Sequence, residues 1–354
     1  MTTIVMDRIC RLFISLQQIK EVPRMLTEAA PSIPGTVRDT EVPPFFRERF
    51  ICTGYRPLHQ RWRYYFLSIF QRHNETVNIW THLLALLVLL VKLCQVAETV
   101  DFAGDRHSWP LLVLIVSAIN YTAWSVLAHL LGGKSELCHY AFFFLDYVGV
   151  AQYQYGSVVV HYYYTIEEDF YSRVHAVFIP VAVLLSWCSC LGCCYGKYCS
   201  HFLPLWVRKV GQVTPSSLAY MWDISPVMHR LLFNPGGLGD PAAIYHLGHI
   251  GFFISCAFFF AYPVLERCLP GRCDILGQSH QLFHVLLSCC TMCQIHASHL
   301  DYVGRRELYE RLHENGAAAL LVGLYVLTVL VCLLIAAFML RKAKNMLDRQ
   351  AKLK

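Results

Sequence analysis

Five polar side chains lie inside long apolar stretches of this sequence, and their types and spacing could build a metal-dependent site. Ser125 and His129 share one stretch, Asp146 lies in the next, and His280 and His284 share another. Residues four apart lie on one helix face. Neutral imidazole binds zinc well, and a carboxylate can orient a metal-bound water. Ionisable groups in apolar segments usually mark function, although such side chains can also serve only as hydrogen bonds between packed helices.

Composition indicates the class of protein. The chain has 354 residues, of which 56% are hydrophobic and 15% charged, and its mean hydropathy is +0.41. These values are typical of an all-α polytopic membrane protein rather than a soluble enzyme. The sequence contains no recognisable phosphate-binding glycine loop and no nucleic-acid-binding module, so nucleic acid is not an expected partner.

The apolar stretches predict the membrane spans. A crossing helix needs about 20 mostly apolar residues, and stretches of this kind lie roughly at 77–97, 109–131, 138–163, 174–195, 213–233, 244–265, 278–299 and 317–340. Asp223, Ser225, Pro226 and His229 interrupt the fifth, but neighbouring helices can satisfy a broken backbone. We therefore predict a seven-helix core over residues 77–299, then an outer loop and an eighth transmembrane helix over residues 300–340.

The distribution of basic residues predicts the orientation. Residues 1–76 lack a cleavable signal, and the aromatic and arginine-rich stretch 62–72 favours an amphipathic helix on the membrane surface. Basic residues gather in this region, in alternate loops and in the tail 341–354. Because cytoplasmic segments carry the excess of Lys and Arg, we expect both termini in the cytoplasm. The basic tail could bind anionic membrane lipids or a G protein, although a simple anchor explains it as well.

This orientation places the polar side chains at one depth. His129 precedes a cytoplasmic turn at 132–134, and Asp146 follows it. His280 and His284 begin a span that enters from the same side. At 1.5 Å per residue, these four side chains lie on the order of 5–10 Å inside the cytoplasmic interface. They can therefore meet and bind a single ion.

Several blocks of sequence carry a resemblance to a known family. They are HNETVNIWTHLL at 73–84, SVLAHLL at 125–131, LDYVGV at 145–150, VLERCLPGRCD at 264–274 and GQSHQLFHVLL at 277–287. In order and internal spacing, these blocks resemble the progestin and adipoQ receptor family, and the resemblance extends over about 42–301. GYRPLHQRWRYYF at 54–66 and SCLGCCYGKY at 189–198 are most similar to the membrane progestin receptor branch, alpha or beta subtype, and ETVDF at 98–102 favours alpha.

The resemblance implies a specific site and function. It implies a zinc site formed by His129, His280 and His284, with Asp146 near the metal-bound water and Ser125 alongside. It also implies a seven-helix core whose N-terminus is cytoplasmic. The progestin-receptor branch is linked to progesterone binding at the plasma membrane, to inhibitory G proteins and to oocyte maturation. Related members of the family are linked to hydrolysis of the amide of ceramide.

The residues themselves leave two functions open. An intramembrane amide hydrolase needs a metal with an open position and a proton carrier, and three histidines with Asp146 would supply them. A steroid receptor needs an apolar slot with donors for ketones. Gln212, at the start of the fifth predicted span, could be such a donor or an ordinary interfacial residue. The resemblance favours the receptor, and the sequence leaves open which steroid binds and whether the chain forms a homo-oligomer.

Two further groups of residues invite functional interpretations. His246 and His249 are three apart near the outer side, where we expect them to face water. The cysteines at positions 188, 190, 193, 194 and 199 gather near a cytoplasmic end. Small packing residues explain these cysteines best, and palmitoylation is the alternative.

Overall fold

The structure is a computed structural model, and it describes residues 34–199, 202–233, 239–314 and 316–353. The chain divides into two units, Met1–Gly35 and Thr36–Lys354, and the second carries the elements that follow. Predictions for residues 1–33 lie outside the described residues. The described part is helical, apart from an isolated β-bridge between Val37 and Tyr55. The predicted all-α class is therefore confirmed for this part of the chain.

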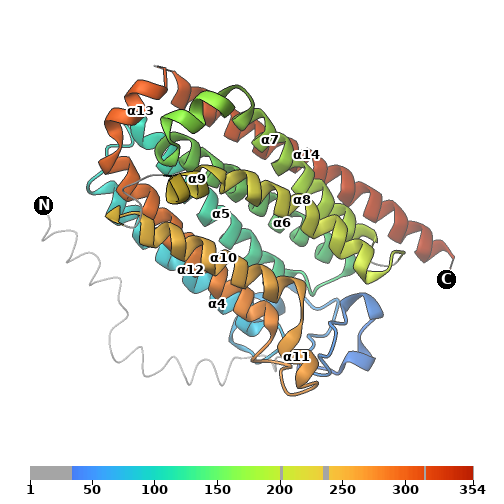
Figure 1. Ribbon diagram of the computed structural model, residues 1–354. Helices are drawn as coiled ribbons and strands as arrows, with labels where there is room; N and C mark the ends of the chain where they lie inside the picture. Colours follow the sequence, from blue (N-terminus) through green and yellow to red (C-terminus); the bar gives the residue numbers. More distant parts are fainter. Residues whose placement is uncertain (1–33, 200–201, 234–238, 315, 354) are drawn as a thin grey trace, which may run out of the picture. The chain divides into compact units, whose positions relative to one another are not determined.

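The long helices follow the apolar stretches and lie side by side in a bundle (Figure 1). They are α4 (Thr76–Ala97), α5 (Trp109–Leu131), α6 (Glu136–Val160), α7 (Glu168–Tyr198), α8 (Leu205–Asp223), α10 (Ala243–Ala261), α12 (Ser279–Gly304) and α14 (Ala317–Lys352). The shorter helices are α3 (Trp62–Leu67), α9 (Ser225–Phe233), α11 (Val264–Cys268) and α13 (Arg306–Leu312). A π-helical turn at His161–Thr165 extends α6, and 3₁₀ turns lie at Asp39–Glu41, Pro44–Phe46, Ser68–Phe70 and Arg106–Ser108.

Membrane-crossing capacity differs among these helices. Within the described residues, five segments are long and apolar enough to cross a membrane: α4, Arg106–Leu131 with α5, α7, α10 and α14. The chain is therefore a polytopic membrane protein. The other three predicted spans also form helices, as α6, α8 with α9, and α12, but polar side chains make them less apolar. The fifth predicted span is broken after Asp223, and Pro226, which lacks a backbone N–H, lies in the first turn of α9.

Small residues allow neighbouring helices to approach closely. A Cβ atom added to Gly149 of α6 would lie 2.8 Å from the Cα atom of Tyr121 in α5. On α7, a Cβ atom at Gly196 would lie 2.8 Å from the Cγ atom of Gln212 in α8. Small residues at helix contacts are the usual means of close packing in membranes. Most cysteines near the end of α7 serve the same purpose, since those at 190, 193, 194 and 199 are buried and only Cys188 is exposed.

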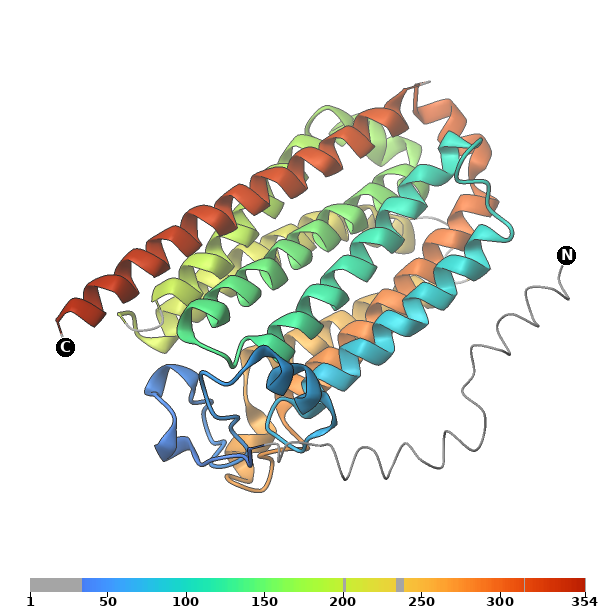
Figure 2. The same ribbon diagram turned by 180° about the vertical axis from the view of Figure 1, so that it is seen from behind.

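The two ends of the bundle carry different elements (Figures 1 and 2). At one end, here called the proximal end, the segment 36–72 and α11 lie against the long helices, and α9 and α13 lie toward the distal end. Helix α3 and the turn after it expose the aromatic side chains of Trp62, Phe66 and Phe70. Helix α14 continues to Lys352, so the basic residues between Arg341 and Lys352 lie on this helix.

One expectation about the distal end is wrong. His246 and His249 of α10 do not face water, since their exposed fractions are 1% and 2%. Both histidines point into the bundle because α10 packs along α12, where His246 meets the carboxylate of Asp301 at 3.0 Å. A polar pair three residues apart looks equally suited to a solvent-facing and a buried helix face until its neighbours are known.

Candidate metal centre

Three histidines meet at the proximal end of the bundle. His129 lies in the last turn of α5, and His280 and His284 lie one turn apart at the beginning of α12. One ligand atom of each lies within 4.8 Å of the others. The Nε2 atoms of His129 and His280 are 3.4 Å apart, and His129 and His284 have ring centroids 5.0 Å apart. The structure therefore brings together the three histidines that the sequence singled out.

The donor set fits a divalent metal ion such as zinc. Zinc–nitrogen bonds of about 2.0–2.1 Å at a tetrahedral angle separate two nitrogen atoms by about 3.3–3.4 Å, close to the distance between His129 and His280. Nδ1 of His284 already contacts the carbonyl oxygen of Asn78 at 3.2 Å and Thr81 Oγ1 at 3.1 Å, so its Nε2 is the atom left for a metal. Two imidazole lone pairs facing each other need a proton or a cation between them.

Glu75, directly before α4, orients His129. Its Oε2 atom lies 2.7 Å from Nδ1 of His129 and accepts a hydrogen bond of 2.7 Å from Nδ2 of Asn78. Burial opposes ionisation of this carboxyl group, but His129 and Asn78 outweigh it and hold the pKa of Glu75 well below its usual range. A carboxylate behind a histidine ligand fixes the ring and makes the other nitrogen more basic. Glu75 therefore turns Nε2 of His129 toward the other two histidines.

A fourth histidine, His82, packs against this centre. Its ring stacks on that of His284, with centroids 3.7 Å apart and planes 11° from parallel. Both ring nitrogens are buried without a hydrogen-bond partner in the described part of the chain. Sequence reasoning did not assign Glu75 or His82 to the site. Their spacing with Asn78, three and then four residues along the first turns of an apolar helix, was the signal that could have found them.

Loop residues at the proximal end set the positions of the helix ends. Arg56 donates to the carbonyl oxygens of His129 and Leu130, both at 2.6 Å. These carbonyls end α5 and have no partner within the helix, so the guanidinium satisfies them and complements the helix dipole. At the start of α12, Gln278 donates to the carbonyl oxygen of Asn74 at 3.1 Å. Both contacts tie the histidine-bearing turns to the segment before α4.

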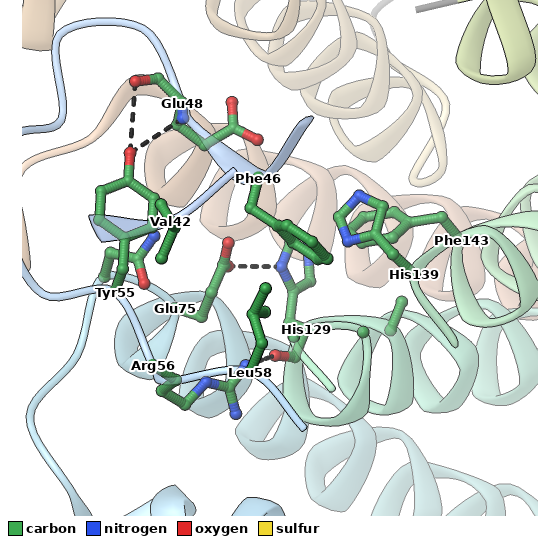
Figure 3. A pocket seen from close by; sticks show the side chains of 14 residues that line it. Val42, Phe46, Glu48, Tyr55, Arg56, Leu58, Glu75, His129, His139 and Phe143 are labelled. Carbon is green, nitrogen blue, oxygen red and sulfur yellow. Dashed lines mark hydrogen bonds and ion pairs between the residues drawn. The ribbon is translucent and has the colours of Figure 1, made fainter. Parts of the chain in front are cut away.

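A small pocket reaches His129 from the side of these loops (Figure 3). Its volume is ≈ 40 Å³, and its lining includes Glu75, His129, Arg56, His139 and Phe143. This volume suffices for water, which needs roughly 10–15 Å³ per molecule on this scale and at least two polar partners. Water can therefore be held beside the histidine centre among charged and polar groups.

The other predicted site residues lie in different surroundings. Ser125 is buried one turn before His129. Asp146 on α6 interacts electrostatically with His129 and Lys197, but the carboxylate hydrogen-bonded to His129 is that of Glu75. Gln212 lies within α8 at the contact with Gly196 of α7. The structure thus places Asp146 near the centre and Gln212 in a helix–helix contact.

The fold and the site together define a polytopic helical membrane protein with a three-histidine centre, in which His129 and His284 are buried and His280 half-buried, that could hold a metal ion. The haemolysin-III related family matches residues 70–295. Membrane progestin receptor alpha-B of Danio rerio is 50% identical over 353 residues, which cover 99% of each chain. Membrane progestin receptor alpha of Homo sapiens is 46% identical over 347 residues, 98% of this chain and 99% of the relative. Membrane progestin receptor beta of Homo sapiens is 48% identical over 315 residues, 88% of this chain and 89% of the relative. The chain therefore belongs to the haemolysin-III related family, in the branch of the membrane progestin receptors.

Proposed function

We propose that this chain is a plasma-membrane receptor for progesterone or a related steroid and acts through an inhibitory G protein. The observation that carries this proposal is identity of 46–50% over nearly the whole chain to proteins named membrane progestin receptors. The aligned region spans the histidine centre and the long helices, because it covers 98–99% of this chain. A steroid dissolves in the bilayer, and a helix bundle with polar side chains inside can offer it both apolar contact and hydrogen bonds.

We also propose the topology of the receptor. Residues 77–299 form a seven-helix transmembrane core, α14 is an eighth span, and 1–76 and 341–354 lie in the cytoplasm. The excess of basic residues at the proximal end supports this orientation. The less apolar helices α6 and α12 can still cross, because their polar residues Ser157, Gln294 and Asp301 are buried in the bundle. Tags at either terminus should be stained only after permeabilisation, and staining of an N-terminal tag on intact cells would invert the topology.

We assign zinc to the three-histidine centre with a structural role in the receptor. His129 lies on α5 whereas His280 and His284 lie on α12, so one ion would tie two spans together. Binding to the folded state alone stabilises that state. Steroid binding then depends on the metal only through the integrity of the bundle.

The experiment is saturation binding of labelled progesterone to purified protein, with metal analysis of the same sample. Wild-type protein should bind the steroid saturably and contain zinc, and His284→Ala should lose the metal. Ser288→Ala, one turn further along α12, is a matched control because its hydroxyl donates to the carbonyl oxygen of His284 at 2.7 Å and supplies no metal ligand. Absence of saturable binding in folded, zinc-containing wild-type protein would refute the receptor function.

A second function is supported by the water-sized pocket beside His129 together with the electrostatic interaction of Asp146, which does not line that pocket, with the same histidine. The alternative is a zinc-dependent intramembrane hydrolase of ceramide-type lipid amides. Zinc, when bound, would supply a Lewis acid for the amide carbonyl. Asp146 would orient a water molecule and take its proton, with Ser125 alongside. Release of fatty acid from ceramide by the wild type, lost in Asp146→Asn with zinc retained, would establish the enzyme in place of the receptor.

A further inference from the structure

A second group of buried polar side chains lies toward the distal end of the bundle. Asp223 at the end of α8 accepts a hydrogen bond from Nδ1 of His161 at 2.8 Å, and Gln294 of α12 lies 3.3 Å from Nε2 of the same ring. Asp301 accepts from Nε2 of His246 at 3.0 Å and from Arg230 at 2.8 Å. We call this group the distal polar cluster; it consists of Ser157, His161, Asp223, Arg230, His246, His249, Gln294 and Asp301.

Four buried polar atoms at this cluster have no hydrogen-bond partner among the described residues. They are the hydroxyl of Tyr220, Nδ1 of His246, Nδ1 of His249 and Oγ of Ser298. The ring centroid of His249 lies 5.6 Å from that of His161 and 6.1 Å from that of Tyr220. Ser298 lies on α12 one turn from both cluster residues of that helix. The unpaired groups therefore come from α8, α10 and α12: those of Tyr220 and His249 are neighbours, and Ser298 lies on the face of α12 that carries Gln294 and Asp301.

These atoms indicate a missing partner. A buried polar atom without a hydrogen bond costs about 1–3 kcal/mol, so native proteins rarely leave several together. A carboxylate only accepts hydrogen bonds, so Nε2 of His246 carries a proton and donates to Asp301. If the ring is neutral, Nδ1 of His246 is then an acceptor. Tyr220, Ser298 and His249 can each donate. The unpaired donors therefore suit an oxygen acceptor, such as a ketone or hydroxyl oxygen.

The cluster is separated from the outside of the bundle by a pair of aromatic rings. Tyr220 of α8 and Phe253 of α10 stack face to face, with centroids 3.4 Å apart and planes 8° from parallel. Both side chains are partly exposed, whereas His249 behind them is buried. In the proposed topology, this partly exposed side of α8 and α10 would face lipid. A flat apolar skeleton arriving from the lipid could take the place of Phe253 against the ring of Tyr220.

We propose that a flat, lipid-soluble ligand binds here, with its ketone or hydroxyl oxygen held by Tyr220, His249 and Ser298 and its ring system lying between α8 and α10. The proposal rests on the proposed steroid-receptor function and assigns it a site away from both the histidine centre and Gln212. Tyr220 supplies a hydroxyl donor and an aromatic face, which together match a fused-ring ketone. The stacked rings of Tyr220 and Phe253 lie at the position proposed for the ligand's ring system.

The test is a double-mutant cycle between protein hydroxyls and ligand ketones. Affinities of progesterone, and of two analogues in which one or the other ketone is replaced by methylene, are measured for wild type, Tyr220→Phe, Ser298→Ala and Gln212→Ala. We expect Tyr220→Phe to reduce the affinity for progesterone by about five- to tenfold, and to leave the affinity for one analogue at its wild-type value. Tyr155→Phe is the matched control, because its buried hydroxyl bonds the carbonyl oxygen of Leu321 at 3.3 Å elsewhere in the core.

Each outcome decides the proposal separately from the receptor function. Wild type could bind progesterone while Tyr220→Phe and Ser298→Ala reduce the affinity for all three steroids equally. These side chains would then contribute only to packing, and the proposed site would be wrong, although the receptor function would stand. If only Gln212→Ala shows coupling to a ketone, the donor belongs to the α7–α8 contact and the proposal is likewise overturned. Failure of folded wild type to bind any of the steroids refutes both. Zinc content and melting temperature near wild-type values verify that each variant is folded.

Discussion

Replacing Glu75 by Gln should weaken metal binding at the three-histidine centre without removing a metal ligand. The change keeps the size of the side chain and its hydrogen bond to Asn78, but it replaces a charged acceptor 2.7 Å from Nδ1 of His129 by a neutral one. Hydrogen bonds to a charged acceptor are roughly twice as strong as neutral ones. His129 should therefore become a less basic and less firmly oriented ligand.

The magnitude follows from the position of Glu75 behind the ligand. Loss of such an outer carboxylate typically reduces metal affinity by about 10- to 100-fold, or about 1.4–2.7 kcal/mol. We expect the lower end for Glu75→Gln, because an amide oxygen can still accept from Nδ1, and the upper end for Glu75→Ala. At a fixed zinc concentration that exceeds the dissociation constant, a tenfold weaker site also makes the folded state about 1.4 kcal/mol less stable.

The assay is competition for zinc between the purified protein and a fluorescent chelator, with melting temperature measured in parallel. Glu98→Gln is the matched control, since this glutamate is exposed at the other end of α4. The control should retain wild-type affinity. Equal zinc affinities for wild type, Glu75→Gln and Glu75→Ala would show that the contact with His129 does not serve a metal, and the assignment of the centre would have to be abandoned.

His284→Ala should lose zinc and melt at a lower temperature, whereas Asp146→Asn should keep most of the metal, as metal analysis and thermal denaturation of the same samples will establish. Burial disfavours the charge of Asp105, but Arg306 at 3.0 Å and two further hydrogen bonds outweigh burial and lower the pKa of Asp105. The stabilisation of the folded state by this carboxylate, about 1 kcal/mol or less, is present above the ordinary pKa of about 3.9 and is lost as pH falls through the folded pKa. Asp105→Asn should therefore lower the melting temperature at pH 7 and make no difference in strong acid. Arg56→Met should destabilise the protein by about 3 kcal/mol in denaturation at constant metal, because it leaves the last carbonyl oxygens of α5 unpaired, and an unchanged stability would contradict its capping role.

The identity of the metal-centre histidines could be predicted from the sequence because a membrane leaves few reasons for an ionisable group in an apolar helix. The spacing of His280 and His284 places both on one helix face, and the positive-inside bias brings His129 to the same depth. The lengths of the apolar stretches likewise predict the long helices, and the polar residues and proline at 223–229 mark the place where the fifth predicted span divides into α8 and α9. These features depend on local periodicity and on solvation, which a linear sequence contains.

Only the tertiary structure decided which polar side chains interact with each other. Glu75 meets His129 across 54 positions of sequence, and Arg56 reaches the end of α5 across 73, because the loops at the proximal end fold back over the helix ends. The same holds for His246, which looks suited to solvent in the sequence and is buried against Asp301 in the bundle. A polar residue on a helix has the same periodicity whether it faces water, lipid or a partner. Which of these it meets depends on the packing of helices that are distant in sequence.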